Sequence, residues 1–213
     1  MAVKLEVREM VFIIDDDESL REALARLFWS VGLGVQAYAT PPEFLASKLP
    51  DVPSCLVLDI RLPGMSGLDF QAELGNANIN IPIIFITGHG DIPMTVKAMK
   101  AGAVEFLTKP LREQDLLDAV RTALVRDRAR REQQSTEADL RSRFETLTTR
   151  EKEVMGFVAA GLMNKQIAAK MELSEVTVKF HRGHIMRKMA ARSLADLVRM
   201  AESLGIHQQK PKS

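Results

Sequence analysis

Hydrophobic residues in the first half of the chain fall into short runs that alternate with amphipathic segments. Five short, mostly apolar runs predict buried strands; they cover residues 10–14, 35–39, 54–59, 81–86 and 104–107. Between them, apolar residues recur at helical spacing over residues 19–31, 40–49, 68–74 and 94–100, and again from residue 113 to about 124. Strands that alternate with helices predict an α/β domain over residues 1–124, built on a doubly wound, five-stranded parallel sheet.

The pattern changes after residue 124, where apolar positions become sparse. Residues 125–145 contain neither Gly nor Pro and are rich in helix formers. They predict a polar helical linker, which is rigid if the helix persists and a tether if it frays. Leu140, Phe144 and Leu147 recur at a spacing that also suits a coiled coil, and this alternative stays open.

The remaining residues, 146–213, predict a small all-α domain. Thr148 or Thr149 can cap a first helix that runs through Val158, and Ser193 can start a last one. Between them, helical patterns over residues 164–171 and 175–189 are separated by a tight turn. Two helices joined in this way predict a helix-turn-helix.

Charge divides the chain at about the same place. The net charge of +1 combines −7 over residues 1–120 with +8 over residues 121–213, so the second half is a candidate for nucleic acid. No apolar stretch approaches membrane-spanning length, and the first residues lack the apolar core of a signal peptide. The single cysteine, Cys55, lies inside a predicted strand. We therefore expect a cytoplasmic protein with no membrane partner.

Polar residues stand at the carboxyl ends of the predicted strands, where doubly wound sheets collect their chemistry. They are Asp15, Asp16, Asp59, Thr87 and Lys109. Carboxylates held close together repel, so they must raise a pKa, recruit the lysine or bind a cation. Oxygen ligands without Cys or His suit Mg²⁺, and a carboxylate beside a metal, a lysine and a hydroxyl is arranged to accept a phosphoryl group.

Residues 10 to about 125 resemble the receiver domain of bacterial two-component response regulators, because the paired acids, the mid-sheet Asp, the Thr and the Lys-Pro pair occur in this order. The resemblance implies a flavodoxin-like receiver in which Mg²⁺ is held by Asp15, Asp16, Asp59 and the backbone carbonyl of Arg61. It also implies that Asp59 accepts phosphate from a sensor histidine kinase. Thr87 and Lys109 would contact the phosphoryl group, Phe106 would be the switch residue, and Lys109-Pro110 would be a cis peptide.

Some neighbours of these residues have plainer interpretations. Asp17 and Glu18 suit a solvated helix start, because acids are favourable at a helix N-terminus. Phe106 is also explained as an ordinary core aromatic of a strand. His89 is either a simple loop residue or a group that controls the access of water to a phosphorylated Asp59.

The helix-turn-helix segment resembles the LuxR-type DNA-binding domain through LTTREKEV, GLMNKQIA and LSEVTVKFHRGHIMRKM. With the receiver, it places the chain in the NarL/FixJ class of response regulators, near the FixJ-like branch. We expect Val176, Val178, Ile185 and Met189 to face the core. The N-terminal half of the helix over residues 175–189, which exposes Thr177, Lys179, Phe180 and Arg182, fits the major groove. The resemblance implies base-reading positions at Lys179, Phe180 and Gly183. Phosphate contacts are expected from Asn164, Lys165 and Thr177, and further cations project from Arg187 and Lys188. Gly183 departs from the polar or basic residue common in the family.

The predicted function is therefore that of a phosphorylation-controlled transcriptional regulator and not an enzyme. Phosphorylation of Asp59 is expected to promote a homodimer that binds double-stranded promoter DNA, with RNA polymerase as a further partner. One alternative is a DNA-binding regulator that works without phosphorylation. The other is a phosphohydrolase that turns over an aspartyl phosphate, although Arg61 stands where such enzymes usually carry a second Asp.

Overall fold

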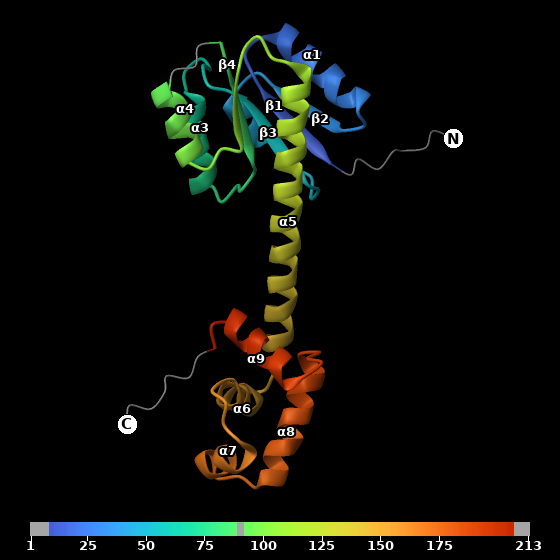
Figure 1. Ribbon diagram of the computed structural model, residues 1–213, viewed down its shortest axis with the longest axis vertical. Coiled ribbons are helices and arrows are strands. Elements are labelled where there is room, and N and C mark those ends of the chain that lie inside the picture. The colour runs from blue at the N-terminus through green and yellow to red at the C-terminus, as the bar shows by residue number, and fades with distance from the viewer. Residues whose placement is uncertain (1–8, 89–91, 207–213) are drawn as a thin grey trace, which may run out of the picture. The chain divides into compact units, whose positions relative to one another are not determined.

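The computed structural model describes residues 9–88 and 92–206 and divides the chain into two compact units, residues 1–131 and 132–213. The first unit contains a parallel sheet, and the second contains helices (Figure 1). The predicted fold class is confirmed by this architecture. The predicted linker, residues 125–145, lies within one continuous helix, α5, which contributes residues to both units. Within the described residues, no helix is long and apolar enough to cross a membrane.

The sheet of the first unit consists of five parallel strands in the order β2-β1-β3-β4-β5. The strands are β1 (Met10–Ile14), β2 (Gly34–Tyr38), β3 (Ser54–Asp59), β4 (Ile83–Thr87) and β5 (Glu105–Thr108). The helices between and after them are α1 (Glu18–Ser30), α2 (Pro41–Ala46), α3 (Gly67–Asn76), α4 (Ile92–Lys100) and α5 (Glu113–Glu145). The strand order reverses between β1 and β3, so their carboxyl ends flank the position where such sheets bind ligands.

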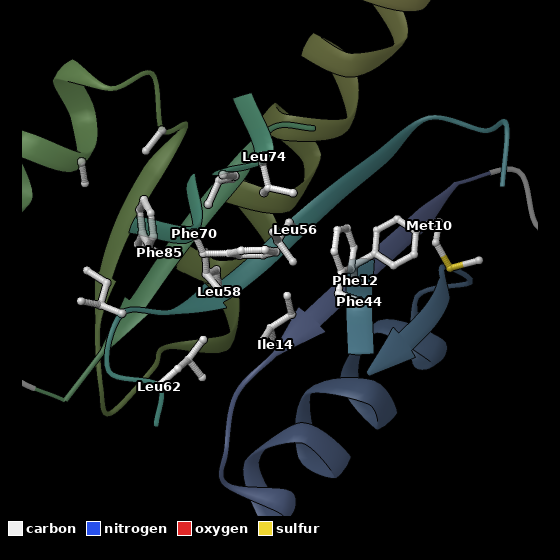
Figure 2. Packing of buried hydrophobic residues seen from close by; sticks show 14 residues of the cluster. Met10, Phe12, Ile14, Phe44, Leu56, Leu58, Leu62, Phe70, Leu74 and Phe85 are labelled. Atoms are coloured by element: carbon white, nitrogen blue, oxygen red, sulfur yellow. The ribbon is translucent and has the colours of Figure 1, made fainter. Parts of the chain in front are cut away.

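Two hydrophobic layers enclose the sheet because successive side chains of a strand point to opposite faces. Met10, Phe12 and Ile14 of β1 pack into the layer beneath α2, α3 and α4 (Figure 2), whereas Val11 and Ile13 pack against α1 and α5. In the first layer the ring of Phe44 stands nearly perpendicular to the rings of Phe12, Tyr38 and Phe70, with centroids 5.3 to 6.0 Å apart. Burial on both faces explains why the three inner strands β1, β3 and β4 are nearly continuous apolar runs rather than alternating ones.

The short helix α2 differs from its prediction at both ends. Thr40 precedes it, but its side chain makes no capping hydrogen bond, and the helix ends at Ala46 rather than near residue 49. Pro41 and Pro42 occupy the first turn, where proline is tolerated because the missing amide would have no helical partner. The prolines therefore account for the start of α2.

The central part of α5 is fastened to the edge of the sheet opposite Asp59. The buried carboxylate of Asp127 accepts hydrogen bonds from the Ser54 amide at 2.9 Å and from Arg131 Nε at 2.7 Å. Arg131 also donates to Asp51, and Arg128 donates to Glu9. These contacts explain why α5 continues past residue 124, where its apolar face ends.

Up to residue 206, the second unit contains the end of α5 and the helices α6 (Thr149–Ala159), α7 (Asn164–Met171), α8 (Glu175–Lys188) and α9 (Leu194–Ser203). Side-chain caps from Thr148 and Ser193 start α6 and α9, as the sequence predicts, and the side chain of Ser174 caps α8. Leu147 is buried in the core of this unit, and Leu140 and Phe144 pack against it. The helical spacing of these three residues is therefore explained by packing within this unit and needs no coiled coil.

Candidate functional site

Two acidic side chains reach the carboxyl edge of the sheet from adjacent strands. Asp15 directly follows β1 and is completely buried, while Asp59 is the last residue of β3 and is 5% exposed. Asp15 Oδ1 accepts a hydrogen bond from the Asp17 amide at 2.9 Å, and Asp59 Oδ1 accepts one from the Arg61 amide at 3.0 Å. Each carboxylate is therefore oriented by the backbone that follows it.

Lys109 brings a cation from β5 to both of these carboxylates. Its Nζ donates to Asp15 Oδ2 at 2.7 Å and to Asp59 Oδ2 at 2.6 Å. The Lys109 amide also donates to the carbonyl of the buried Thr87 at 2.7 Å, and the Lys109-Pro110 peptide is cis. The four strand-end groups thus lie together, although they are separated by up to 94 positions in the chain.

Burial and pairing change the proton affinities of this cluster. Burial raises the pKa of Asp15 above its ordinary value, even though hydrogen bonds from Lys109 and from the Asp17 amide act in the opposite direction. Burial alone would lower the pKa of Lys109, but its hydrogen bonds to Asp15 and Asp59 outweigh this and raise it. Lys109 therefore remains the cation that balances the two buried acids.

The donor set fits a hard divalent cation. One carboxylate oxygen from each of Asp15, Asp16 and Asp59 lies within 4.8 Å of the others. Asp16 is exposed, which leaves one side of the cluster open to solvent. Oxygen ligands with an open side suit an ion such as Mg²⁺, which keeps waters and accepts phosphate oxygens.

Gly67 is a feature of this site that the sequence-based prediction missed. It is the first residue of α3, and its amide donates to the Ile60 carbonyl at 2.9 Å. A Cβ atom at this position would lie 2.5 Å from the Asp59 carbonyl oxygen and 3.0 Å from the Ile60 Cα atom. Gly67 thus allows α3 to pack directly against the main chain of the central carboxylate. The Pro63-Gly64 loop signal indicates a turn here, but not this close approach.

The remaining receiver residues singled out from the sequence have different outcomes. Phe106 lies in β5 beside Phe85 of β4 and is partly buried against the core layer of α2, α3 and α4. Arg61 is the second residue after the end of β3. Its side chain is exposed, as is that of Asp17, whose carboxylate caps α1. His89 lies outside the described residues.

The second unit presents the helix-turn-helix. α7 and α8 are joined through Glu172, which has a left-handed backbone conformation. Val178, Ile185 and Met189 face the core as predicted. The prediction for Val176 is wrong, because its side chain is 78% exposed. It lies about half a turn from the core-facing side of α8.

The predicted DNA-contacting residues fall into two groups. Lys165, Lys179, Phe180, Gly183 and Arg187 are exposed. The others make contacts inside the unit: Arg182 donates to Asn164 Oδ1 at 2.7 Å, Thr177 pairs with the hydroxyl of Ser174, and Lys188 Nζ donates to the buried Glu151 at 2.7 Å. Lys188 therefore neutralises a buried acid inside the unit in addition to contributing to the positive charge of its surface.

Comparison with known proteins assigns both units. Residues 11–121 match the family described as "Response regulator receiver domain", and residues 145–201 match "Bacterial regulatory proteins, luxR family". Nodulation protein W of Bradyrhizobium diazoefficiens is 64% identical over 199 residues, which cover 93% of this chain and 88% of that protein. The chain is a response regulator of the NarL/FixJ class.

Further relatives of this response regulator match along nearly their whole length. The transcriptional regulatory protein FixJ of Rhizobium meliloti is 44% identical over 192 residues, covering 90% of this chain and 94% of that protein. The solved structure of the response regulator StyR superimposes with a TM-score of 0.83 at 49% identity, covering 92% of this chain and 98% of that one. The predicted receiver, LuxR-type domain and regulatory role are confirmed by these matches.

The DNA-binding unit of this response regulator is held together by the buried Glu151. Glu151 is 3% exposed, and its carboxylate accepts hydrogen bonds from Lys188 Nζ and from the Thr148 amide, the latter at 2.8 Å. His184 Nδ1 lies 3.6 Å from the same carboxylate. Burial would raise the pKa of Glu151, but the hydrogen bonds from Lys188 and Thr148 outweigh it and lower the pKa from 4.5 to about 2. The ionised carboxylate therefore joins α6 to α8.

Replacement of Glu151 by glutamine is expected to lower the stability of this unit by about 2 kcal/mol near neutral pH. Because folding lowers the pKa of Glu151, its contribution is complete above about pH 4.5 and is lost as the pH falls toward about 2. Hydrogen exchange of the α6 and α8 amides, measured in the full chain, gives this difference at each pH. The deficit of Glu151→Gln should shrink on acidification, and the exposed neighbour Glu153→Gln serves as control. A deficit that is independent of pH would contradict the assignment.

Proposed function

We propose that Asp59 is the phosphoacceptor that controls DNA binding by the second unit. The observation that carries this is the convergence of Asp15, Asp59 and Lys109, with Lys109 Nζ within 2.7 Å of both carboxylates at the carboxyl edge of the sheet. In the transfer, an Asp59 carboxylate oxygen forms a bond to phosphorus while the bond between phosphorus and the donor breaks. The donor is a phosphohistidine of a sensor kinase, or a small acyl phosphate in a test tube.

Each neighbouring group has a task in this transfer. Asp15, Asp16, Asp59 and the Arg61 carbonyl would hold Mg²⁺, which supplies positive charge to the phosphoryl oxygens when it is bound. Lys109 already contacts Asp59, so it can move its hydrogen bond from the carboxylate to a phosphoryl oxygen. Thr87 ends the adjacent strand and can donate its hydroxyl to the same group.

The proposed output is tighter binding of promoter DNA by a phosphorylated homodimer. Phosphorylation adds charge at the sheet edge and shifts Thr87 and Phe106 toward a second conformation. Asn164, Lys165, Thr177, Lys179, Phe180, Arg182, Gly183, Arg187 and Lys188 form the proposed DNA surface. Two such surfaces in a symmetric dimer suit paired half-sites, and RNA polymerase is a further proposed partner.

The test compares the full chain with Asp59→Asn. With acetyl phosphate and Mg²⁺, the parent should incorporate about one phosphate per chain and bind selected promoter DNA more tightly, whereas Asp59→Asn should do neither. Asp69→Asn, at an exposed position of α3, is the control and should behave as the parent. Equal responses from Asp59→Asn and the parent would contradict the proposal.

The same assay separates the two alternative functions. DNA binding of equal strength with and without acetyl phosphate would favour a regulator that works without phosphorylation. Rapid catalytic release of phosphate from small phosphate esters would favour a phosphohydrolase. Arg61 follows two residues after Asp59 and cannot serve as the carboxylic acid that such hydrolysis usually requires.

A further inference from the structure

Two large apolar side chains stand in solvent on the helix that is proposed to enter the major groove. Val176 is 78% exposed and Phe180 is 61% exposed. Both belong to α8, four positions apart, so they are neighbours on one side of the helix. Their exposure is not explained by the fold of the unit, because the core is completed by Val178, Ile185 and Met189.

The exposed pair lies opposite the core-facing side of α8. With about 100° between successive residues, one arc of about 100° contains Val176, Lys179, Phe180, Gly183 and, near the end of the helix, the exposed Arg187. Val178, Ile185 and Met189 lie on the other side of the helix, where all three are buried. This arc is therefore the surface that α8 can offer to a partner.

The arc combines apolar and cationic side chains. Of its five residues, Lys179 and Arg187 have side chains that can donate hydrogen bonds, and Lys179 is the one next to Phe180. Gly183 has no side chain, and a Cβ built there would meet nothing within 4 Å. Arg182 lies off this arc and is held by Asn164 at 2.7 Å. The arc thus offers two cations, two apolar side chains and, at Gly183, a gap through which the helix can approach closely.

Phe180 is also held in a defined position. Its ring centroid is 4.1 Å from that of His184, one turn further along α8, at an interplanar angle of 50°. Such a contact restricts the rotamers of an exposed side chain, so less conformational entropy is lost when the ring is buried by a partner. The surrounding charges are those of a surface for DNA, since Lys165, Lys179 and Arg187 are exposed nearby in α7 and α8.

We propose that Val176 and Phe180 form a thymine-reading ridge, in which the two apolar side chains contact the C5-methyl groups of thymines in the major groove. The methyl group is the one apolar feature that a base pair presents there, and it suits an apolar side chain in the way that a guanine suits arginine. The half-site should accordingly contain thymine at the positions opposite these residues. This inference rests on the proposed DNA-binding function.

The test removes single methyl groups from the DNA. A duplex is first selected from random sequences by the phosphorylated full chain, and each thymine of a half-site is then replaced by deoxyuridine, which lacks only the methyl group. At one or two positions the parent protein should lose affinity by about three- to tenfold. At those positions Val176→Ala or Phe180→Ala should bind the thymine and uracil duplexes equally.

The controls separate failure of the ridge from failure of DNA binding. Leu194→Ala removes a comparable exposed apolar side chain from α9, outside the two helices, and should keep the parent's preference for thymine. Circular dichroism establishes that each variant is folded. Tight binding that is insensitive to every uracil replacement would overturn the thymine-reading ridge and leave the proposed function intact. If no sequence is enriched and no duplex is bound, both the thymine-reading ridge and the proposed DNA-binding function are contradicted.

Discussion

Gly67→Ala is expected to slow phosphorylation of Asp59 by at least about tenfold, because the reacting carboxylate would be displaced. The added Cβ would lie 2.5 Å from the Asp59 carbonyl oxygen, which is main chain and cannot rotate away. Either α3 or the end of β3 must shift, and overpacking of this kind also costs about 1–3 kcal/mol of stability. Stopped-flow phosphorylation with acetyl phosphate and Mg²⁺ measures the rate, and urea unfolding measures the stability.

Gly75→Ala is the matched control for this prediction. Gly75 belongs to the same helix, but a Cβ there meets no atom within 4 Å. Alanine also favours the helix, so this variant should keep the parental rate and be equally stable or slightly more so. Parental phosphorylation by Gly67→Ala would show that the close approach of α3 does not position Asp59.

Lys109→Met is expected to lower the free energy of unfolding of the receiver by about 3 kcal/mol in buffer without divalent ions. The substitution removes the cation that contacts both Asp15 and Asp59 and leaves two buried carboxylates facing each other. Addition of Mg²⁺ should restore part of the loss, because the ion can replace the missing charge. Denaturation followed by the fluorescence of the single tryptophan, Trp29, measures both effects in the receiver.

Lys100→Met controls for the loss of a lysine side chain. Lys100 lies exposed at the end of α4, and its replacement should change the stability by less than about 0.5 kcal/mol. Asp59 of Lys109→Met should in addition be phosphorylated more slowly, since the cation that balances the phosphoryl charge is absent. If Lys109→Met were as stable as the parent and Mg²⁺ had no effect on it, the charge balance assigned to Lys109 would be wrong.

The convergence of the receiver site could be predicted from the sequence because a parallel sheet places the carboxyl ends of its strands at one edge. Asp15 and Asp59 each follow a continuous apolar run, and such runs are predicted reliably when both faces of a strand are buried. The position of each acid along its strand then determines where it lies. The caps of Thr148, Ser174 and Ser193 were predictable for a similar reason, since they act only on residues next to them in the chain.

Contacts between distant segments were not predictable in this way. The approach of Gly67 to Asp59 depends on the angle at which α3 meets the sheet, which no local pattern encodes. The pairing of Lys188 with Glu151 joins residues 37 positions apart. The sequence pattern around Lys188 therefore indicated only a surface cation. Val176 was misplaced because valine is usually a core residue, whereas here it lies on the side of α8 that faces away from the core.

The central claim is that Asp59 carries the phosphoryl group, and the most direct measurement is to locate that group in the full chain. After reaction with acetyl phosphate and Mg²⁺, borohydride reduces an aspartyl phosphate to homoserine, and mass spectrometry of peptides identifies the altered residue. The account predicts that the change occurs at Asp59 and disappears in Asp59→Asn. Modification of Asp15, Asp16 or any other residue in place of Asp59 would contradict it.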